Sequence, residues 1–561
     1  MENRIGKQYE TWEWKHSGPA PAGSQAEIDL RGSFQGDGKS MAVKGFYAGN
    51  GEYRLRFLPE AAGDYSYEIV SDSLGIRESG VLHAEPADAG RHGPVRAKGT
   101  ALFYADGTRF ASFGTTVYAL ANQSKALIEE TLETLGEAPF NKLRTCVFPK
   151  HYAYNANNPR FYPFEVKAGQ AQRAFSAEGL PVFPLRKGVA DDYWDTERPC
   201  FAFWEHLEAV LQRLDALGIQ ADLILFHNYD RWGFSNMSRA DNLRYLDYLL
   251  RRLAAFPNIW WSMANEYDLC FDKSDEDFRT FEAFIAANDP YGHLLSNHNC
   301  FQMWDASRET VSHISFQTKE LTRVAELMRK FGKPVLVDEC RYEGNIPEFW
   351  GNLSGQDLVR SFWRVTVQGG FCTHGETYLP ETPQGKLATR TGEKDVVWWA
   401  KGGRLNGQSP ERIAFLRSVI ESLPGPLEPV EGGFPELANL EEEALRETIA
   451  RFPEDFQSFL GSIARMNRLE RELFYAVEYN YEGHCGDSAF LSYLDDQCPA
   501  VYEMKLPEDR LYRVDVLDTW EMTRQTALQG VKGKVRVKLP GKPYMAVLAV
   551  AEELGEEEEN G

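Results

Sequence analysis

The stretch "PNIWWSMANEYD", residues 257–268, decides how the middle of this chain folds. Its apolar run, Ile259 to Ala264, has the length of a buried strand, and two polar residues, Asn265 and Glu266, follow it at once. In a (β/α)8 barrel, residues at the carboxyl ends of the strands line the active-site pocket. If the flanking sequence builds such a barrel, Asn265 and Glu266 end its fourth strand and point into that pocket.

The flanking sequence has the alternation that a barrel requires. From about residue 101, short apolar runs alternate with amphipathic segments, several of which end in the Gly that often follows a helix. We expect helices within residues 124–136, 204–218, 240–256, 275–288, 321–332 and 356–370. We expect about eight strands, which lie in "FASFGTTVY" (110–118), "FNKLRTCVF" (140–148), "IQADLILFHN" (219–228), "NIWWSMANE" (258–266), "HLLSNHN" (293–299), "HISFQT" (313–318), "PVLVDEC" (334–340) and "GGFCTHGETY" (369–378). Strands that alternate with helices in this way predict a (β/α)8 barrel.

Both ends of the chain show the two-residue alternation of antiparallel strands. It covers residues 25–98 and returns in "LFYAVEYN" (473–480), "AFLSYL" (489–494), "YRVDVLDTW" (512–520), "VRVKLPG" (535–541) and "YMAVLAV" (544–550). The predicted fold class is therefore α/β, a TIM barrel flanked by an N-terminal Ig-like β-sandwich and a C-terminal β-sandwich. The predicted boundaries are 1–98 for the first sandwich, 99–428 for the barrel, 429–470 for a helical bridge, 471–554 for the second sandwich and 555–561 for an acidic tail.

Composition and charge limit the kinds of molecule that the protein can bind. The formal net charge of -22 over 561 residues repels nucleic acid and anionic membranes, so we predict a small carbohydrate substrate, no nucleic acid and no membrane. No window reaches the length of a membrane span and no signal peptide is evident, so we expect a cytoplasmic protein. The eight cysteines lack CxxC spacing, and no HExxH or GxxxxGK motif occurs, so no cofactor or metal is predicted. Whether the chain forms a homo-oligomer is left open.

A second carboxylate ends the seventh predicted strand. The run "KPVLVDEC" closes with Asp338 and Glu339, and strand alternation allows only one of them to face the pocket. We assign Glu339 to the pocket, with Asp338 as the alternative. Glu266 and Glu339 would then face each other across the barrel mouth, where burial beside "WWSM" should raise the pKa of Glu266.

This combination resembles the retaining (β/α)8 glycoside hydrolases of clan A and, more narrowly, the apiosidase-like barrel proteins with a sandwich at each end and "HGETY" near strand eight. The resemblance implies that Glu266 is the acid/base and Glu339 the nucleophile. It also implies that Arg144, in "KLRTC", keeps Glu339 ionised and that Asn265 binds the sugar 2-hydroxyl. The chain departs from clan A at "SFQT" and "THGET", where many members place a Tyr or His and a Trp. Arg144 could instead be a structural ion-pair partner.

Other strand ends supply groups suited to sugar hydroxyls and ring faces. The predicted substrate-binding residues, besides Arg144 and Asn265, are His227, Trp232, His298, Gln317, His374 and Glu376. Trp194, Trp304, Trp350, Trp398 and Trp399 lie in predicted loops, where an indole can stack on a sugar. An alternative reading makes His227, His298, Asp230 and Glu376 a metal site, but no pair of ligands at helical spacing supports it.

We therefore predict a retaining exo-β-glycosidase, β-galactosidase- or β-glucosidase-like, that removes the terminal sugar of oligosaccharides or glycosides. The long loops at 149–200 and 378–408 would close the cleft into a pocket, which favours exo action. The alternatives are a pentosidase such as an apiosidase or arabinosidase, a non-catalytic carbohydrate-binding protein, and a metal-dependent hydrolase.

Overall fold

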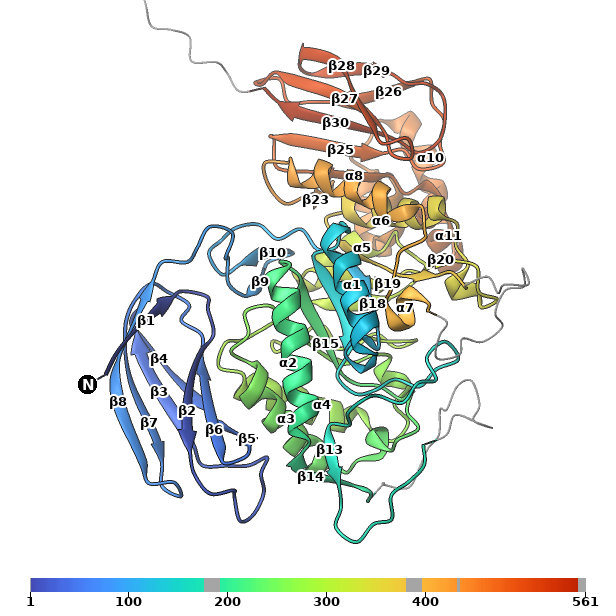
Figure 1. The fold of residues 1–561 in the computed structure, drawn as a ribbon. Coiled ribbons are helices and arrows are strands. Elements are labelled where there is room, and N and C mark those ends of the chain that lie inside the picture. The colour runs from blue at the N-terminus through green and yellow to red at the C-terminus, as the bar shows by residue number, and fades with distance from the viewer. Residues whose placement is uncertain (1, 176–191, 380–395, 431–433, 553–561) are drawn as a thin grey trace, which may run out of the picture. The chain divides into compact units, whose positions relative to one another are not determined.

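The computed structural model describes residues 2–175, 192–379, 396–430 and 434–552 (Figure 1). The chain divides into two compact units. The first comprises Met1–Thr318, Phe331–Leu358 and Phe371–Pro410. The second comprises Lys319–Lys330, Val359–Gly370 and Glu411–Gly561.

The first unit contains an almost closed barrel of eight parallel strands. The strands are β11 (Phe113–Thr116), β12 (Lys142–Cys146), β15 (Gln220–Phe226), β16 (Ile259–Ala264), β17 (Leu295–Ser296), β18 (Ile314–Gln317), β19 (Val335–Glu339) and β21 (Phe371–His374). Their order around the sheet is β17-β16-β15-β12-β11-β21-β19-β18, and every neighbouring pair is parallel. Within the described residues, no strand ladder joins β17 to β18. Each strand falls in one of the eight predicted segments, so the barrel prediction is confirmed.

Three of the first four helices of the barrel begin at a serine that caps them. α1 (Lys125–Glu137), α2 (Phe201–Ala216), α3 (Arg239–Leu253) and α4 (Asp275–Asn288) alternate with the first strands of the barrel (Figure 1). Ser124, Ser238 and Ser274 each accept a hydrogen bond from a backbone amide three residues on, which satisfies a donor in the first turn. All residues of β12, β15 and β16 are buried, as expected for parallel strands that are covered on both faces.

Two sheets precede the barrel, and all their strand pairs are antiparallel except β1–β8, which is parallel. One has the order β1-β8-β7-β3-β4 and the other β2-β6-β5. Their strands are β1 (Glu2–Lys7), β2 (Trp12–Ser17), β3 (Arg31–Gly36), β4 (Lys39–Lys44), β5 (Phe46–Gly49), β6 (Glu52–Phe57), β7 (Gly63–Ser71) and β8 (Ile76–Glu85). The sheets share an aromatic core, in which Trp14 of β2 lies 5.3 Å from Phe34 of β3, centre to centre, and Phe34 lies 3.9 Å from Phe57 of β6. β1 and β2 lie upstream of the alternation recognised in the sequence.

Short elements fill the connections of the first unit. They are β9 (Val95–Lys98), β10 (Ala101–Tyr104), β13 (Phe164–Val166), β14 (Trp194–Pro199), β20 (Glu343–Gly344), β22 (Glu376–Thr377), α7 (Trp398–Lys401), η1 (Leu120–Asn122), η2 (Phe234–Asn236), η3 (Tyr267–Leu269) and η4 (Phe349–Gly351). β20 and β22 pair in parallel, with Glu343 opposite Glu376, just beyond the carboxyl ends of β19 and β21.

The second unit combines helices with antiparallel sheets. Its helices are α5 (Val324–Phe331), most of α6 (Gly355–Val367) and α8 (Ser409–Glu421), η5 (Phe434–Asn439), α9 (Glu442–Ile449), α10 (Glu454–Ala464) and α11 (Arg468–Glu478). Its strands are β23 (Glu428–Pro429), β24 (Tyr481–His484), β25 (Ala489–Tyr493), β26 (Val501–Lys505), β27 (Tyr512–Asp518), β28 (Thr523–Val531), β29 (Lys534–Lys538) and β30 (Met545–Ala551). They form the sheets β23-β24-β25-β30-β27-β28 and β26-β29, which contribute to one apolar core.

One predicted strand of this unit is wrong. The segment "LFYAVEYN" is mostly helical, because α11 continues to Glu478 and the first strand after it begins at Tyr481. A capping box at Asn467 and Glu470 starts this helix. Helical structure therefore extends beyond the predicted boundary at residue 470.

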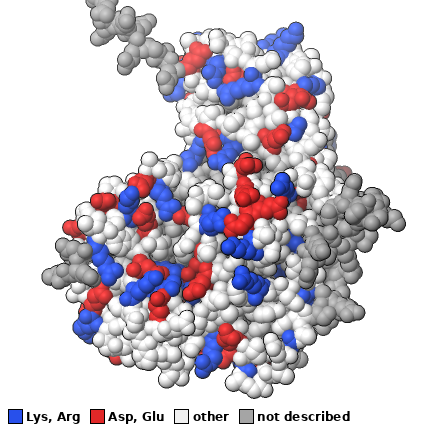
Figure 2. All heavy atoms as spheres, viewed as in Figure 1, with Lys and Arg blue, Asp and Glu red and all other residues white. Residues whose placement is uncertain are grey.

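Charge is distributed in mixed fashion on the face shown in Figure 2, where acidic and basic side chains are interspersed. None of the helices described in the structure is both long and apolar enough to cross a membrane.

Candidate active site

Glu266 and Glu339 stand at the carboxyl ends of two barrel strands, β16 and β19. Glu266 is 7% exposed, and the Glu339 side chain is 13% exposed. Glu266 has a left-handed backbone, with φ 53° and ψ 61°, between the end of β16 and the start of η3. A non-glycine residue adopts this conformation at some cost, and such strain is often concentrated at functional sites.

An amide and a phenol connect the two carboxylates. Asn265 Nδ2 donates to Glu266 Oε2 at 3.1 Å. On the other side of that amide, the Tyr118 hydroxyl lies 2.8 Å from Asn265 Oδ1 and also within hydrogen-bond distance of Glu339 Oε1. The two acids from β16 and β19 therefore belong to one hydrogen-bond network at the barrel mouth.

Two further side chains hold Glu266. The Tyr229 hydroxyl donates to Glu266 Oε2. Gln317, with its amide nitrogen turned toward Glu266, donates to Glu266 Oε1 at 3.2 Å and to the Asn299 carbonyl at 3.0 Å. Both oxygens of Glu266 thus have donors, which fixes the orientation of the carboxyl group.

Arg144 lies beside Glu339, as the family resemblance implied. Its side chain is fully buried, with Nη1 3.9 Å from Glu339 Oε1 and Nε 3.5 Å from Asp222 Oδ2. Within the described chain, none of its three guanidinium nitrogens has a hydrogen-bond partner. The positive charge of Arg144 therefore lies close to Glu339, although the two side chains do not form a direct hydrogen bond.

Asp338, the alternative to Glu339, is part of the barrel interior. Asp338 Oδ1 lies 2.5 Å from Lys142 Nζ and accepts from the Thr373 hydroxyl at 2.7 Å, while Oδ2 accepts from the Ser315 hydroxyl at 2.6 Å. These contacts, above all the Lys142 charge, hold the pKa of Asp338 well below its usual range despite burial. The assignment of Glu339 to the barrel mouth therefore agrees with the structure.

Lys150 is a site residue that the sequence analysis missed. Its buried ammonium lies 3.4 Å from the ring centre of Tyr118, 4.3 Å from that of Tyr229 and 5.3 Å from that of Trp399. The two tyrosines are those that bond to Glu339 and Glu266. Burial lowers the pKa of Lys150, and the nearby charges of Cys146, Glu266 and Glu339 oppose that shift.

The raised pKa falls on Glu339, whereas the sequence analysis expected it on Glu266. Burial and then the charge of Glu266 raise the pKa of Glu339 to about 7, against the lowering effects of Arg144, Tyr118 and Lys150. Two carboxyl groups whose charges interact titrate as a pair, because ionising one disfavours ionising the other. Near neutral pH the pair therefore holds one proton.

Aromatic side chains surround this network. A buried cluster at the barrel mouth includes Tyr118, Tyr152, Tyr154, Tyr229, Tyr342 and Trp399, with Trp350 packed against it. Trp399 lies 4.9 Å from Trp350 and 5.5 Å from Tyr152, centre to centre. Of the five loop tryptophans singled out in the sequence, Trp350 and Trp399 are the two in this cluster.

The remaining predicted binding residues divide into two groups. His298 lies at the pair, because the backbone amide of Glu266 donates to its Nδ1 at 3.4 Å. His227 is near Tyr229, with ring centres 6.4 Å apart, and its Nε2 lies 3.2 Å from the Phe148 carbonyl. Trp232 is only 1% exposed and donates to Asn158, so its ring is packed within the protein.

His374 and Glu376 have partners outside the catalytic network. His374 Nδ1 lies 3.0 Å from the Thr115 hydroxyl, and Glu376 accepts hydrogen bonds from the backbone amides of Asn406 and Gly407. The alternative metal site is not assembled: among the described residues, the one group placed to hold a metal is Glu343, His374 and Glu376. Asp230 instead accepts from the backbone amides of residues 232, 233 and 235.

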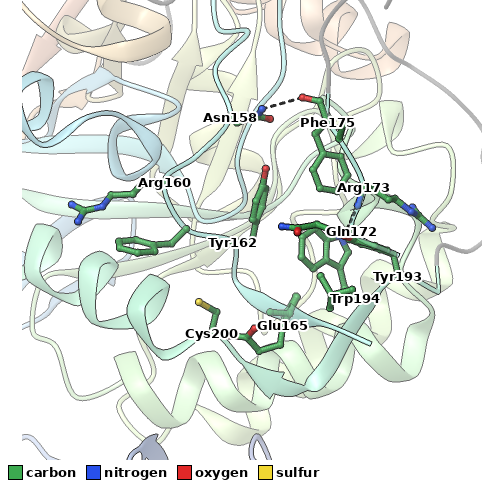
Figure 3. A pocket seen from close by; sticks show the side chains of 14 residues that line it. Asn158, Arg160, Tyr162, Glu165, Gln172, Arg173, Phe175, Tyr193, Trp194 and Cys200 are labelled. Carbon is green, nitrogen blue, oxygen red and sulfur yellow. Dashed lines mark hydrogen bonds between the residues drawn. The ribbon is translucent and has the colours of Figure 1, made fainter. Parts of the chain in front are cut away.

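A separate cavity of about 610 Å³ lies in the long connection between β12 and α2 (Figure 3). Its walls include the rings of Tyr162, Phe175 and Trp194, together with the side chains of Arg160 and Gln172. None of the residues that bond to Glu266 or Glu339 lines it. Asn158 links its rim to Trp232, whose indole donates to the Asn158 side chain at 3.0 Å.

Comparison with known families identifies the barrel. A family model described as the apiosidase-like catalytic domain matches residues 96–424, which is more than half of the chain. The chain belongs to the apiosidase-like family. Two domains of unknown function match the flanking regions of this apiosidase-like chain, DUF5060 over residues 6–72 and DUF5605 over residues 478–549. None of the curated proteins compared with the chain matches it.

Solved structures agree with this assignment. The crystal structure of a candidate glycoside hydrolase from Bacteroides vulgatus is 30% identical, with a TM-score of 0.79 over 98% of this chain and 100% of that protein. A family 5 glycoside hydrolase from Bacteroides vulgatus has a similar fold, at 15% identity, with a TM-score of 0.55 over 82% of this chain and 93% of that one. The prediction that this apiosidase-like protein is a glycoside hydrolase is confirmed at the level of enzyme class.

Proposed function

We propose that the chain is a retaining exo-β-glycosidase that removes the terminal sugar of oligosaccharides or glycosides by double displacement. The observation that carries this proposal is the network in which Asn265 and Tyr118 join Glu266 to Glu339. Retaining glycosidases use two carboxyl groups about 5–5.5 Å apart, of which one attacks the sugar and the other transfers the proton. A proton that leaves the pair only near pH 7 is available for that transfer.

The roles follow from what surrounds each carboxylate. Glu339, beside Arg144 and the Tyr118 hydroxyl, is the nucleophile, because both neighbours stabilise its negative charge. Glu266 carries the proton to the leaving oxygen, so the proton that the pair shares lies on Glu266, and not on Glu339, when the sugar reacts. When the glycosyl–Glu339 ester forms, the negative charge of Glu339 disappears, and Glu266 then deprotonates the attacking water.

The substrate contacts belong to the same proposal. The Asn265 amide hydrogen-bonds the sugar 2-hydroxyl, and Gln317 and His298 bind near Glu266. Trp399 and Tyr152 offer apolar faces for the CH groups of the ring. The flanking sheets are proposed to be β-sandwich domains that support the barrel. The predicted closing loops, 149–200 and 378–408, lie partly outside the described residues.

A pentoside is the second candidate substrate, and the family match favours it, because the matching model is described as apiosidase-like. A panel of nitrophenyl β-glycosides of hexoses and pentoses separates the two. We expect one glycone to exceed the others by at least tenfold in kcat/KM. A pentoside preference would select the second candidate.

Two variants test the catalytic assignment. We expect Glu266→Gln and Glu339→Gln to keep the fold and to lower kcat by a factor of about 10³ or more. Incubation with 2-deoxy-2-fluoro glycosides should add one glycosyl group to the peptide that contains Glu339. Full activity in either variant, or an adduct on another residue, would overturn the proposal.

A further inference from the structure

Three buried side chains outside the catalytic network come together near the ends of β19 and β21. They are Glu343, His374 and Glu376, and one potential ligand atom from each lies within 4.8 Å of the others. Each is at most 1% exposed. The parallel pairing of β20 with β22 sets the two carboxylates opposite each other. Neither the sequence analysis nor the proposed glycosidase mechanism uses this group as a unit.

Backbone amides fix both carboxylates. Glu376 accepts from the amides of Asn406 at 2.6 Å and Gly407 at 2.8 Å, one on each oxygen. Glu343 accepts from the amides of Gln408 at 2.7 Å on Oε1 and Ser409 at 3.0 Å on Oε2, and Oε1 also accepts from the Tyr378 hydroxyl at 3.1 Å. Four consecutive amides therefore aim the two acids at the same place. A carboxylate oxygen with one such donor retains a lone pair for a metal.

Two of these oxygens converge at Gly407. A Cβ added to Gly407 would lie 2.4 Å from Glu343 Oε2 and 2.7 Å from Glu376 Oε2, so both oxygens border the same small space. In the described chain, neither carboxylate forms an ion pair with a lysine or arginine. Burying two neighbouring acids without a cation is unfavourable, and a bound metal ion removes that cost.

His374 supplies the observation that points to a ligand. Its Nδ1 lies 3.0 Å from the Thr115 hydroxyl, and that hydroxyl also accepts from the Trp398 indole at 2.9 Å. The imidazole stacks on Phe140, with ring centres 4.7 Å apart. Its Nε2 is buried and has no hydrogen-bond partner among the residues that the structure describes. An imidazole held through Nδ1 with a free Nε2 is the arrangement that metal-binding histidines show.

We propose that Glu343, His374 and Glu376 bind one divalent cation of the zinc type, which fastens the 406–409 loop to β20 and β22. One imidazole and two carboxylates favour Zn²⁺ or Mn²⁺ over Ca²⁺ and Mg²⁺, which take all-oxygen sites. Ligands about 2.0–2.2 Å from Zn²⁺ lie closer together than 4.8 Å, so binding draws the three side chains inward. The role is structural and does not depend on the proposed glycosidase mechanism.

Metal content and calorimetry test this site. The full-length protein is stripped with a chelator, reloaded with Zn²⁺ and desalted, and its metal is then counted by mass spectrometry. We expect one Zn²⁺ per chain, a rise in the thermal unfolding midpoint on loading, and, in calorimetric titrations, tighter binding of Zn²⁺ and Mn²⁺ than of Ca²⁺. Glu376→Gln and His374→Phe should each weaken Zn²⁺ binding at least 100-fold and abolish the rise in midpoint.

The control is Glu266→Gln, which changes a buried acid outside this group and should keep one Zn²⁺ per chain. Absence of stoichiometric Zn²⁺ in the wild-type protein would overturn the site even if a variant failed to fold. Unchanged Zn²⁺ binding in both site variants would overturn it as well, because the ion would then lie elsewhere. A preference for Ca²⁺ would overturn the assigned metal class.

Discussion

The Lys150 ammonium lies 3.4 Å from the centre of the Tyr118 ring, and the hydroxyl of that ring donates to Glu339. The positive charge of Lys150 therefore lies beside Tyr118, whose hydroxyl helps to connect the two proposed catalytic carboxylates. Lys150 and Arg144 both lower the pKa of Glu339, whereas burial and Glu266 raise it. The balance among these effects and the hydrogen bond from Tyr118, which also lowers this pKa, sets the pH at which Glu339 loses its proton.

The first prediction concerns pH. Because the pKa of Glu339 is raised to about 7, kcat/KM should fall as the pH rises through about 7, where the pair loses its last proton. Lys150→Met removes a charge that lowers this pKa. The alkaline limb of the profile should therefore move upward by about one pH unit. The profile is measured with the best substrate of the nitrophenyl panel.

Lys150→Arg is the matched control, since it keeps the charge and should keep the limb near its wild-type position. A Lys150→Met profile that loses activity evenly at all pH values would show that Lys150 acts only through packing.

Removing the Tyr118 hydroxyl should impair catalysis more than folding. Tyr118→Phe deletes the donor to Glu339 and the contact with Asn265, so we expect kcat/KM to fall about 10- to 100-fold. The control is Tyr245→Phe, which deletes a buried hydroxyl that donates to the Leu225 carbonyl in the barrel wall. The two variants should have similar unfolding midpoints, and only Tyr118→Phe should lose activity.

Glu339 should lower the stability of the protein at alkaline pH. Its folded pKa of about 7 exceeds the ordinary 4.5, so the stability gained from its neutral form is complete below about pH 4.5 and is lost as the pH rises through 7. The difference corresponds to about 3 kcal/mol. Glu339→Gln avoids this loss, so its unfolding midpoint should exceed that of the wild type at pH 8 and approach it at pH 4.5. A constant difference across that range would contradict the raised pKa.

Removing the charge of Asp338, the neighbour of Glu339, should destabilise the protein, whereas Glu339→Gln should stabilise it at pH 8. Asp338 is fully buried and lies 2.5 Å from Lys142, so Asp338→Asn removes the nearer of the two carboxylates that pair with this buried ammonium and leaves only Asp222 at 3.0 Å. We expect the free energy of unfolding to fall by about 3–5 kcal/mol. Thermal or denaturant unfolding measures this loss. If the variant is as stable as the wild type, the buried Asp338–Lys142 pair does not contribute to the free energy of unfolding, which would contradict this prediction.

The barrel could be predicted because two local signals agreed. Each strand was an apolar run and each helix an amphipathic segment, and the bounds of α4, Asp275–Asn288, match the prediction at both ends. The segment that became α11 was misread because a short apolar run does not distinguish strand from helix. There the capping box at Asn467 was the overlooked signal.

The site was predictable only where a residue ends a strand. That rule placed Glu266 and Glu339 together, whereas Arg144, in the middle of β12, was assigned from the family resemblance. It could not find Tyr118 or Lys150, which follow β11 and β12 by a few residues and reach the pair through loops. Nor could it show that His374 turns to Thr115, because the facing of a side chain depends on packing that the sequence does not specify.

The most direct test of the central claim is the stereochemistry of hydrolysis. Proton NMR of the first turnover of a β-glycoside shows which anomer is released before the sugar equilibrates in water. If Glu339 forms a covalent intermediate and Glu266 then activates water, the first product is the β-anomer. Release of the α-anomer would mean a single displacement and would contradict the double displacement proposed for this pair.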